Sequence, residues 1–167
     1  MTPLFSTGKP FDNAAQKNQP NDLQAASSSI YSEAEIYCDG ACSGNPGKSG
    51  IGVVILFHGS KENELRISEY IGEATNNIAE YTSLLKGLTE ADSSGVKKVR
   101  VFMDSELVVK QIKGEYRVRN ENLKLLWVKA MKLIDKFEKF EISHVRRELN
   151  GEADALARSA VEGSKKR

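Results

Sequence analysis

The stretch IYCDGACSGNPGKSGIGVVI, residues 36–55, decides the fold. It joins the end of one apolar run to the start of another and places a carboxylate, Asp39, just before a segment, residues 40–50, with four glycines. These glycines are Gly40, Gly44, Gly47 and Gly50. A tight turn between two strands needs fewer glycines than this. The excess indicates that the backbone here comes close to something bulky, beside a carboxylate.

The sequence around this stretch predicts an α/β domain. Alternating or β-branched apolar residues indicate five strands, at 33–39, 50–58, 63–73, 97–104 and 140–145. Apolar residues at helical spacing indicate helices over 78–95, 105–112 and 120–137, and a last one that Asn150 can cap. This order predicts a five-stranded mixed sheet flanked by helices, with three antiparallel strands first and two added by helical crossovers.

Composition indicates one domain with tails. The chain has 167 residues, of which 40% are hydrophobic and 28% charged, as in ordinary globular proteins. We predict a disordered N-terminal tail over 1–30, a domain over 31–162 and a short basic tail over 163–167. No segment resembles a membrane span or a secretory signal. The two cysteines, Cys38 and Cys42, are typical of ordinary thiols, so we expect a cytoplasmic protein.

The net charge of +1 conceals two halves of opposite sign. Residues 31–96 carry 4 basic and 10 acidic side chains, whereas residues 97–147 carry 14 basic and 7 acidic ones. One half could gather metal ions while the other meets a polyanion. Lysine-rich helix faces are also common on solvated surfaces, so charge alone does not decide between these interpretations.

Four acids stand where ligand sites form in α/β sheets. Asp39 and Asp104 each follow an apolar strand, and Glu80 and Asp154 lie in the first turns of predicted helices. Each has a structural explanation by itself, because a lone acid at the end of a strand is not unusual and the helix dipole favours acids in a first turn. Together they can converge beyond the carboxyl ends of the strands, where they would repel unless cations neutralise them. Oxygen-only ligands select Mg²⁺ or Mn²⁺, and two such ions can clamp a phosphoryl group for attack by water.

Four segments resemble the signature segments of type 1 ribonuclease H, also called ribonuclease HI. They are IYCDGACSGNPGKSGIGVVI, TNNIAEYTSLLKGL, VFMDSELVVKQI and ELNGEADALARSA, and they separate the four acids by 41, 24 and 50 residues. The resemblance covers residues 33–162. It implies the ribonuclease H-like fold and an endonuclease that hydrolyses the RNA strand of RNA–DNA hybrids, leaving 5′-phosphate and 3′-hydroxyl ends.

The resemblance also implies roles for single residues. Asp39, Glu80, Asp104 and Asp154 would be catalytic and would hold two Mg²⁺ ions, or Mn²⁺ in their place. Asp39 would bridge both ions, Asp154 would hold the one that activates water, and the other two acids would hold the one facing the leaving group. Substrate contacts would come from the glycine-rich segment, the next helix start and the third acid's neighbour: Gly40, Cys42, Asn45, Thr75, Asn76, Asn77 and Ser105. The TNN triplet can also be interpreted as the cap of the helix that starts there, although its closeness to Glu80 favours substrate contact.

The chain departs from the family in three places. The loop before the final acid is short and lacks the family's histidine, and His144 falls in the predicted fifth strand. Arg147 and Glu148 are the candidates to replace that histidine. Glu106 stands where many relatives have glutamine, so it is a weaker candidate for substrate contact. KGEYRVRN, residues 113–120, replaces the family's basic protrusion and is either a contact for DNA phosphates or a solvated loop.

We therefore expect a monomeric, metal-dependent endonuclease that acts on RNA–DNA hybrid duplexes, with no membrane and no obligate protein partner. One alternative is a catalytically silent nucleic-acid-binding module of the same fold. Another is a nuclease of the same superfold, such as a DNA resolvase or a 3′ exonuclease. Silent relatives typically lose one or more of the acids, and this sequence retains all four, which favours the enzyme.

Overall fold

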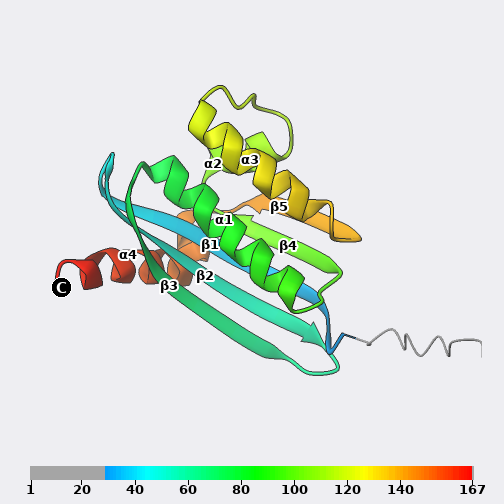
Figure 1. Cartoon of the computed structure of the whole chain (residues 1–167). Helices are drawn as coiled ribbons and strands as arrows, with labels where there is room; N and C mark the ends of the chain where they lie inside the picture. Colours follow the sequence, from blue (N-terminus) through cyan, green and yellow to red (C-terminus); the bar gives the residue numbers. More distant parts are fainter. Residues whose placement is uncertain (1–28, 167) are drawn as a thin grey trace, which may run out of the picture.

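Five strands form one mixed sheet in the computed structural model, which describes residues 29–166. The strands are β1 (Tyr31–Gly44), β2 (Gly47–Gly59), β3 (Asn63–Ala74), β4 (Lys98–Met103) and β5 (Lys139–His144). Their order across the sheet is β3-β2-β1-β4-β5, with β1, β2 and β3 antiparallel and β4 and β5 parallel to β1 (Figure 1). The predicted sheet is confirmed. Residues 1–28 of the predicted N-terminal tail lie outside the described residues.

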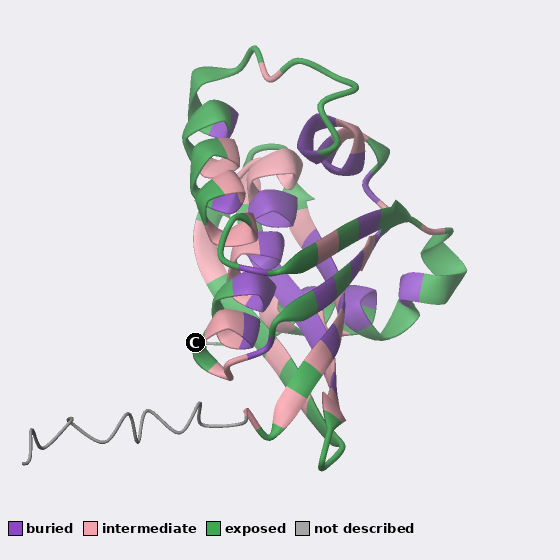
Figure 2. Cartoon of the chain, turned by 90° about the vertical axis from the view of Figure 1, so that its right-hand side faces the viewer, coloured by how far each residue is buried: buried purple, intermediate pink, exposed green. Residues whose placement is uncertain are grey.

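Helices cover both faces of this sheet. They are α1 (Asn76–Ser93), α2 (Glu106–Ile112), α3 (Glu121–Ile134), a short 3₁₀ turn η1 (Arg147–Asn150) and α4 (Gly151–Ser164). On one face α1 packs on β1 and β2 and contacts α3, while α4 crosses β1, β2 and β3 on the other (Figure 1). Figure 2 shows that the buried residues gather along the middle of the strands and on the inner sides of the helices.

The main core lies between α1 and the sheet. Alternate residues of β1 and β2 point into it and meet the apolar side of α1: Ile36, Cys38, Val53, Ile55, Tyr81, Leu84 and Leu88. Within residues 29–166, no helix has both the length and the hydrophobicity needed to cross a membrane. The last helix continues to Ser164, two residues beyond the end of the domain predicted from sequence.

β1 runs five residues further than the sequence predicts. We expected this strand to end at Asp39, but it continues to Gly44, paired with β2 across a turn that contains a cis peptide bond between Asn45 and Pro46. β4 accompanies β1 only as far as Tyr37. Asp39 therefore lies just beyond the point where β4 ends, where the β1–β2 hairpin and its neighbour β3 continue without β4. The glycine-rich segment is the end of that hairpin, because its backbone keeps the β2 partner.

Gly40 lets α1 lie directly against this hairpin. A Cβ atom at Gly40 would come within 2.5 Å of the backbone carbon of Ala79 and the backbone nitrogen of Glu80, closer than real side chains allow. The bulky neighbour predicted for the glycine-rich segment is thus, at this position, the backbone of α1. The contact places Glu80 next to Asp39.

Gly52 does the same for α4 on the other face. It lies opposite Asp39 in the β1–β2 ladder, and a Cβ there would overlap the backbone oxygen of Ala153. The first turn of α4 therefore sits on the sheet with no side chain in between. This contact brings Asp154, the next residue of α4, to the same end of β1.

Replacing Gly52 with alanine should destabilise the domain, because the new methyl group has no room beneath α4. We expect the free energy of unfolding in urea to fall by roughly 1–3 kcal/mol, the usual range for overpacking a filled interior. Gly163→Ala is the matched control, since a Cβ at Gly163 in α4 meets nothing within 4 Å. That variant should be as stable as the parent or slightly more so. An equal loss of stability in both variants would contradict the close packing of α4 against β2 at Gly52.

Candidate active site

The four acids lie around one cavity. Asp39 comes from β1, Glu80 from the second turn of α1, Asp104 from the residue after β4 and Asp154 from the first turn of α4. All four line a cavity of about 250 Å³. The helix contacts described above bring two of them there, and the end of β4 brings the third to Asp39. Four separate elements thus supply carboxylates to one small space.

These acids are more buried than carboxylates usually are. The exposed fractions are 6% for Asp39, 8% for Glu80 and 6% for Asp154, and Asp104 is half-buried. Burial, reinforced by the charges of the other three acids, raises the pKa of Asp39 to about 8. Burial also raises the pKa of Glu80. The cavity therefore holds more negative charge than its surroundings neutralise, as at many functional sites.

Two arginines supply positive charge at Asp154. A guanidinium nitrogen of Arg158 lies 2.6 Å from one carboxylate oxygen, and one of Arg147 lies 3.2 Å from the other. Both arginine side chains are largely exposed and line the same cavity. Asp154 is thus the one acid of the four with direct cationic partners among the described residues.

Amides and hydroxyls hold the other acids. The backbone N–H of Gly40 donates to Asp39 at 2.9 Å, and the side-chain amide of Asn76 donates to Glu80 at 3.2 Å. The Ser105 hydroxyl and the Asn76 amide both stabilise the charged form of Glu80 and so oppose the rise in its pKa. Neutral donors orient these carboxylates without removing their charge.

The donor set suits a hard divalent cation. Carboxylate oxygens are the ligands that Mg²⁺ and Mn²⁺ prefer, and the uncompensated charge at Asp39 favours a cation in the cavity. Within residues 29–166, no three acidic, histidine or cysteine side chains converge on one point as ligands. Asp154 faces its two arginines and Glu80 faces Asn76 instead. To bind the carboxylate oxygens of Asp154 and Glu80, a cation would have to displace the arginine and asparagine side chains that now contact them.

The structure places three of the predicted substrate contacts at the cavity itself, namely Gly40, Cys42 and Asn76. Asn45, in the hairpin turn, accepts a hydrogen bond from the backbone N–H of Asn76 at 3.0 Å and so ties the turn to the start of α1. The hairpin and the first turn of α1 therefore form one continuous rim beside the acids.

The remaining predicted substrate contacts either cap a helix or lie in its first turn. Thr75 caps α1, accepting from the backbone N–H of Ile78 at 3.3 Å, and Asn77 follows in the first turn without lining the cavity. Ser105 caps α2, accepting from the backbone N–H of Val108 at 3.3 Å, and also lowers the pKa of Glu80. For Thr75 the capping interpretation of the TNN triplet holds.

Glu106 is turned away from the acids. Its carboxylate forms an ion pair with Lys110 at 2.7 Å, one turn further along α2. Lys110 in turn lies over the ring of Tyr116, 4.8 Å from its centroid. Both partners lie along α2 and the loop after it, so Glu106 belongs to that surface rather than to the cavity.

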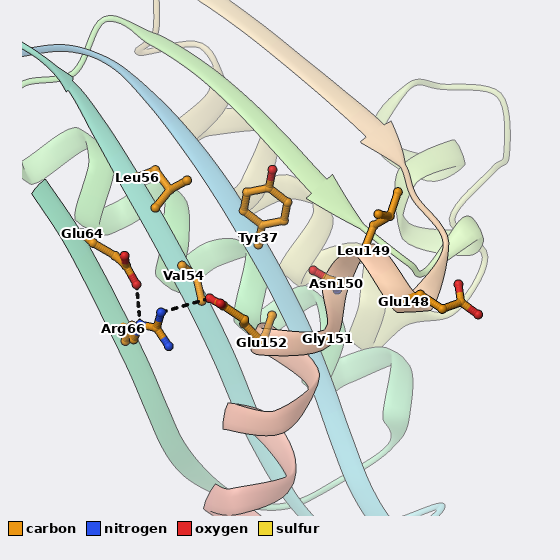
Figure 3. A pocket seen from close by; sticks show the side chains of 11 residues that line it. Tyr37, Val54, Leu56, Glu64, Arg66, Glu148, Leu149, Asn150, Gly151 and Glu152 are labelled. Atoms are coloured by element: carbon orange, nitrogen blue, oxygen red, sulfur yellow. Dashed lines mark hydrogen bonds and ion pairs between the residues drawn. The ribbon is translucent and has the colours of Figure 1, made fainter. Parts of the chain in front are cut away.

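The residues around the shortened loop separate into two groups. Arg147 lines the acidic cavity, whereas Glu148 lines a different cavity of about 570 Å³, beside Tyr37 and Leu149, and points away from the labelled residues of α4 (Figure 3). His144 lies in β5, as the sequence predicts, and is its last residue; its Nε2 lies 3.2 Å from the backbone oxygen of Asp104.

Two residues at the site were missed in the sequence. Arg158 stands four residues after Asp154 on α4, a spacing that places both on one helix face and could have revealed it. Asn150 occupies the N-cap position of α4, as predicted, but its side chain makes no capping hydrogen bond, and its contact with the site was not foreseen. It turns inward and donates to the backbone oxygen of Cys38 and to Asp104, both at 3.0 Å. No local pattern distinguishes this arrangement from a cap.

Comparisons with known proteins agree with this geometry. The sequence profile described as "Reverse transcriptase-like" matches residues 37–160. The chain is 37% identical over 129 residues to "Bifunctional protein Rv2228c" of Mycobacterium tuberculosis. The aligned region covers 77% of this chain but only 35% of the mycobacterial protein. The chain is 34% identical over 151 residues to "Ribonuclease H" of Pelobacter propionicus, covering 82% of this chain and 90% of that one. The crystal structure of LC11-RNase H1 in complex with RNA/DNA hybrid superimposes with a TM-score of 0.70 at 37% identity, over 78% of this chain and 98% of that one.

Replacing Asp39 with asparagine should stabilise the protein in the presence of a chelator. The amide oxygen can still accept from Gly40, while the buried charge is lost, so we expect the free energy of unfolding to rise by roughly 1 kcal/mol or more. Because the pKa is raised in the folded state, the advantage over the parent should grow as pH rises from 3.8 towards about 8. Urea unfolding at several pH values measures this.

The matched control for this prediction is Asp135→Asn, which changes an exposed acid at the end of α3. It should alter stability by less than about 0.5 kcal/mol at every pH. A loss of stability in Asp39→Asn, or a gain equal to that of the control, would show that the four acids do not repel one another in the folded protein.

Proposed function

Because this chain belongs to the ribonuclease H family, we propose that it is an endonuclease that hydrolyses the RNA strand of RNA–DNA hybrids and leaves 5′-phosphate and 3′-hydroxyl ends. The observation that carries the proposal is the meeting of four carboxylates from four elements in one cavity, beside a glycine-rich hairpin. The relative LC11-RNase H1, solved with an RNA/DNA hybrid, supports the hybrid as substrate.

Asp39, Glu80, Asp104 and Asp154 would hold two divalent cations, with Mg²⁺ as the expected ion and Mn²⁺ as a substitute. When bound, such ions supply a water of lowered pKa and neutralise the charge that develops on the phosphate. The protein's own contribution is to fix four carboxylates, one from each of four elements, around one cavity of about 250 Å³. Hydrogen bonds from the Gly40 backbone N–H and the Asn76 side-chain amide hold two of these carboxylates, Asp39 and Glu80, in place.

Recognition of RNA is assigned to the rim of the cavity. Gly40, Cys42, Asn45 and Asn76 lie along the hairpin and the start of α1, where amides and backbone groups can reach the sugar edge of a duplex. The 2′-hydroxyl, which both donates and accepts hydrogen bonds, is the group that distinguishes RNA from DNA there. Thr75, Asn77 and Ser105 would contribute from the adjacent helix starts.

The remaining proposals concern the cellular setting. We place the protein in the cytoplasm as a monomer, in keeping with two free thiols at Cys38 and Cys42. The loop 113–120 is exposed apart from Val118 and carries Lys113, Arg117 and Arg119, which could contact DNA phosphates. The chain spans 35% of the length of its mycobacterial relative, so any further activities of that longer protein are separate questions.

Cleavage assays with an end-labelled RNA strand test the proposal directly. The strand is annealed to DNA or to RNA, and each duplex is incubated with Mg²⁺ or with a chelator. We expect internal cuts in the hybrid only, and only with Mg²⁺. Asp104→Asn should lower the rate by at least about 10²–10³-fold, because it removes a charged oxygen donor without changing shape. Binding of the hybrid without cleavage in Mg²⁺ or Mn²⁺ would instead indicate the silent nucleic-acid-binding module.

Arg147 is the stronger of the two candidates to take over the role of the family's loop histidine. Its guanidinium lies at the cavity, 3.2 Å from Asp154, and its side chain is 70% exposed, so it can swing towards a phosphate or a leaving product. Glu148 lines the other cavity, and its charge would repel the substrate. The two neighbours in sequence thus offer a matched comparison.

Arg147→Ala should lower kcat for hybrid cleavage by roughly 10–100-fold, the scale expected when a single charged group that assists the reaction is lost. Glu148→Ala should change kcat less than about twofold, since the residue contacts nothing at the cavity. Steady-state kinetics at saturating Mg²⁺ measure both. If the two variants were equally active, neither residue would replace the histidine.

A further inference from the structure

One side chain connects three of the elements that carry the acids. Asn150 is the last residue of η1, immediately before α4, and is 1% exposed. Its amide nitrogen donates to the backbone oxygen of Cys38, which precedes Asp39 in β1, and to Oδ1 of Asp104 after β4. Both distances are 3.0 Å. Asp154 follows four residues later on α4.

The orientation of this amide is determined by its neighbours. Both groups within reach of the nitrogen are acceptors, a backbone carbonyl and a carboxylate, so the nitrogen must face them and use both of its hydrogens. The amide oxygen then lies on the other side, buried and without a hydrogen-bond partner. In Figure 3 Asn150 lies at the edge of the groove that also contains Tyr37 and Leu149.

An unsatisfied buried oxygen destabilises a fold. An apolar residue of the same shape would avoid that loss, so stability alone gives a poor account of an asparagine here. The benefit must come from the two hydrogen bonds that the nitrogen makes. One of these fixes Oδ1 of Asp104, which leaves the second carboxylate oxygen for the cavity, and the other fixes Asp104 relative to the chain around Asp39.

We propose that Asn150 is a positioning residue that orients Asp104 for binding a divalent cation. This inference rests on the proposed function, because it presumes that the acids hold Mg²⁺. Residues that orient metal ligands through hydrogen bonds typically change metal affinity by about 10–100-fold when they are removed. Asn150 acts through Asp104 and does not itself line the acidic cavity.

Asn150→Leu is the informative substitution, because leucine keeps the shape and the neutrality of asparagine and removes both donors. Mg²⁺ affinity is read from the rise in unfolding temperature of the full chain as Mg²⁺ is added without substrate. We expect affinity to weaken by about 10–100-fold. In cleavage assays the Mg²⁺ concentration for half-maximal rate should rise by the same factor, while KM for the hybrid stays within about twofold. Where Asn150→Leu does not fold, Asn150→Ser serves.

Asn120→Leu is the matched control. Asn120 caps α3, accepting from the backbone N–H of Leu123 at 3.0 Å, and lies outside the cavity. Its loss should lower the unfolding temperature equally at all Mg²⁺ concentrations. If Asn150→Leu also lowers the unfolding temperature equally at all Mg²⁺ concentrations, the role of Asn150 is structural and the inference is overturned.

A double substitution locates the effect. With Asp104→Asn already in place, Asn150→Leu should weaken Mg²⁺ binding no further, because the residue to be oriented has lost its charge. Additive losses would place the effect at the Cys38 carbonyl instead and overturn the inference. If the parent chain itself neither binds Mg²⁺ nor cleaves the hybrid, the proposed function fails too. If the parent does both and the Asn150 variants bind equally well, the inference alone fails.

Discussion

Two helix backbones lie against the β1–β2 hairpin with no side chain in between, at Gly40 and at Gly52, and the candidate site depends on this contact. At Gly40 it fixes the start of α1, and at Gly52 it fixes the start of α4. A helix start carries the positive end of the helix dipole, so each contact also brings a favourable potential to the acid in its first turns. A larger residue at either glycine would move a carboxylate away from Asp39 rather than merely loosen the packing.

The acids collected in this way oppose the stability of the fold. Desolvation and mutual repulsion raise the pKa of Asp39, and only Asp154 has cationic partners among the described residues. Arg147 and Arg158 approach it from η1 and from α4, and both remain largely exposed. These arginines can leave Asp154 and bind another anion without a change in the fold, because their long side chains are largely exposed. The site thus combines largely buried acids with exposed counter-charges.

Much of this arrangement is predictable from residues 36–55 and the three later segments. Strand and helix types follow from periodicity, and the four acids follow from their places after strands or within first helical turns. The end of β1 is not predictable, because alternation stops at Asp39 while hydrogen bonding to β2 continues through residues whose side chains say little about pairing. The reason for Gly40 is equally hidden, since the atoms that require it belong to α1, about 40 residues away in sequence.

Asn150 shows why the supporting residues of such a site escape sequence analysis. An asparagine before a helix is usually a cap, and local sequence contains no sign that this one turns inward to bond residues from β1 and the end of β4. Its use there leaves the first turn of α4 without a side-chain cap and leaves one buried oxygen unpaired. The missing cap and the unpaired oxygen both lie at the start of α4, the helix that carries Asp154. A fold selected only for stability would cap that helix; this one uses the amide to hold Asp104 beside Asp39 instead.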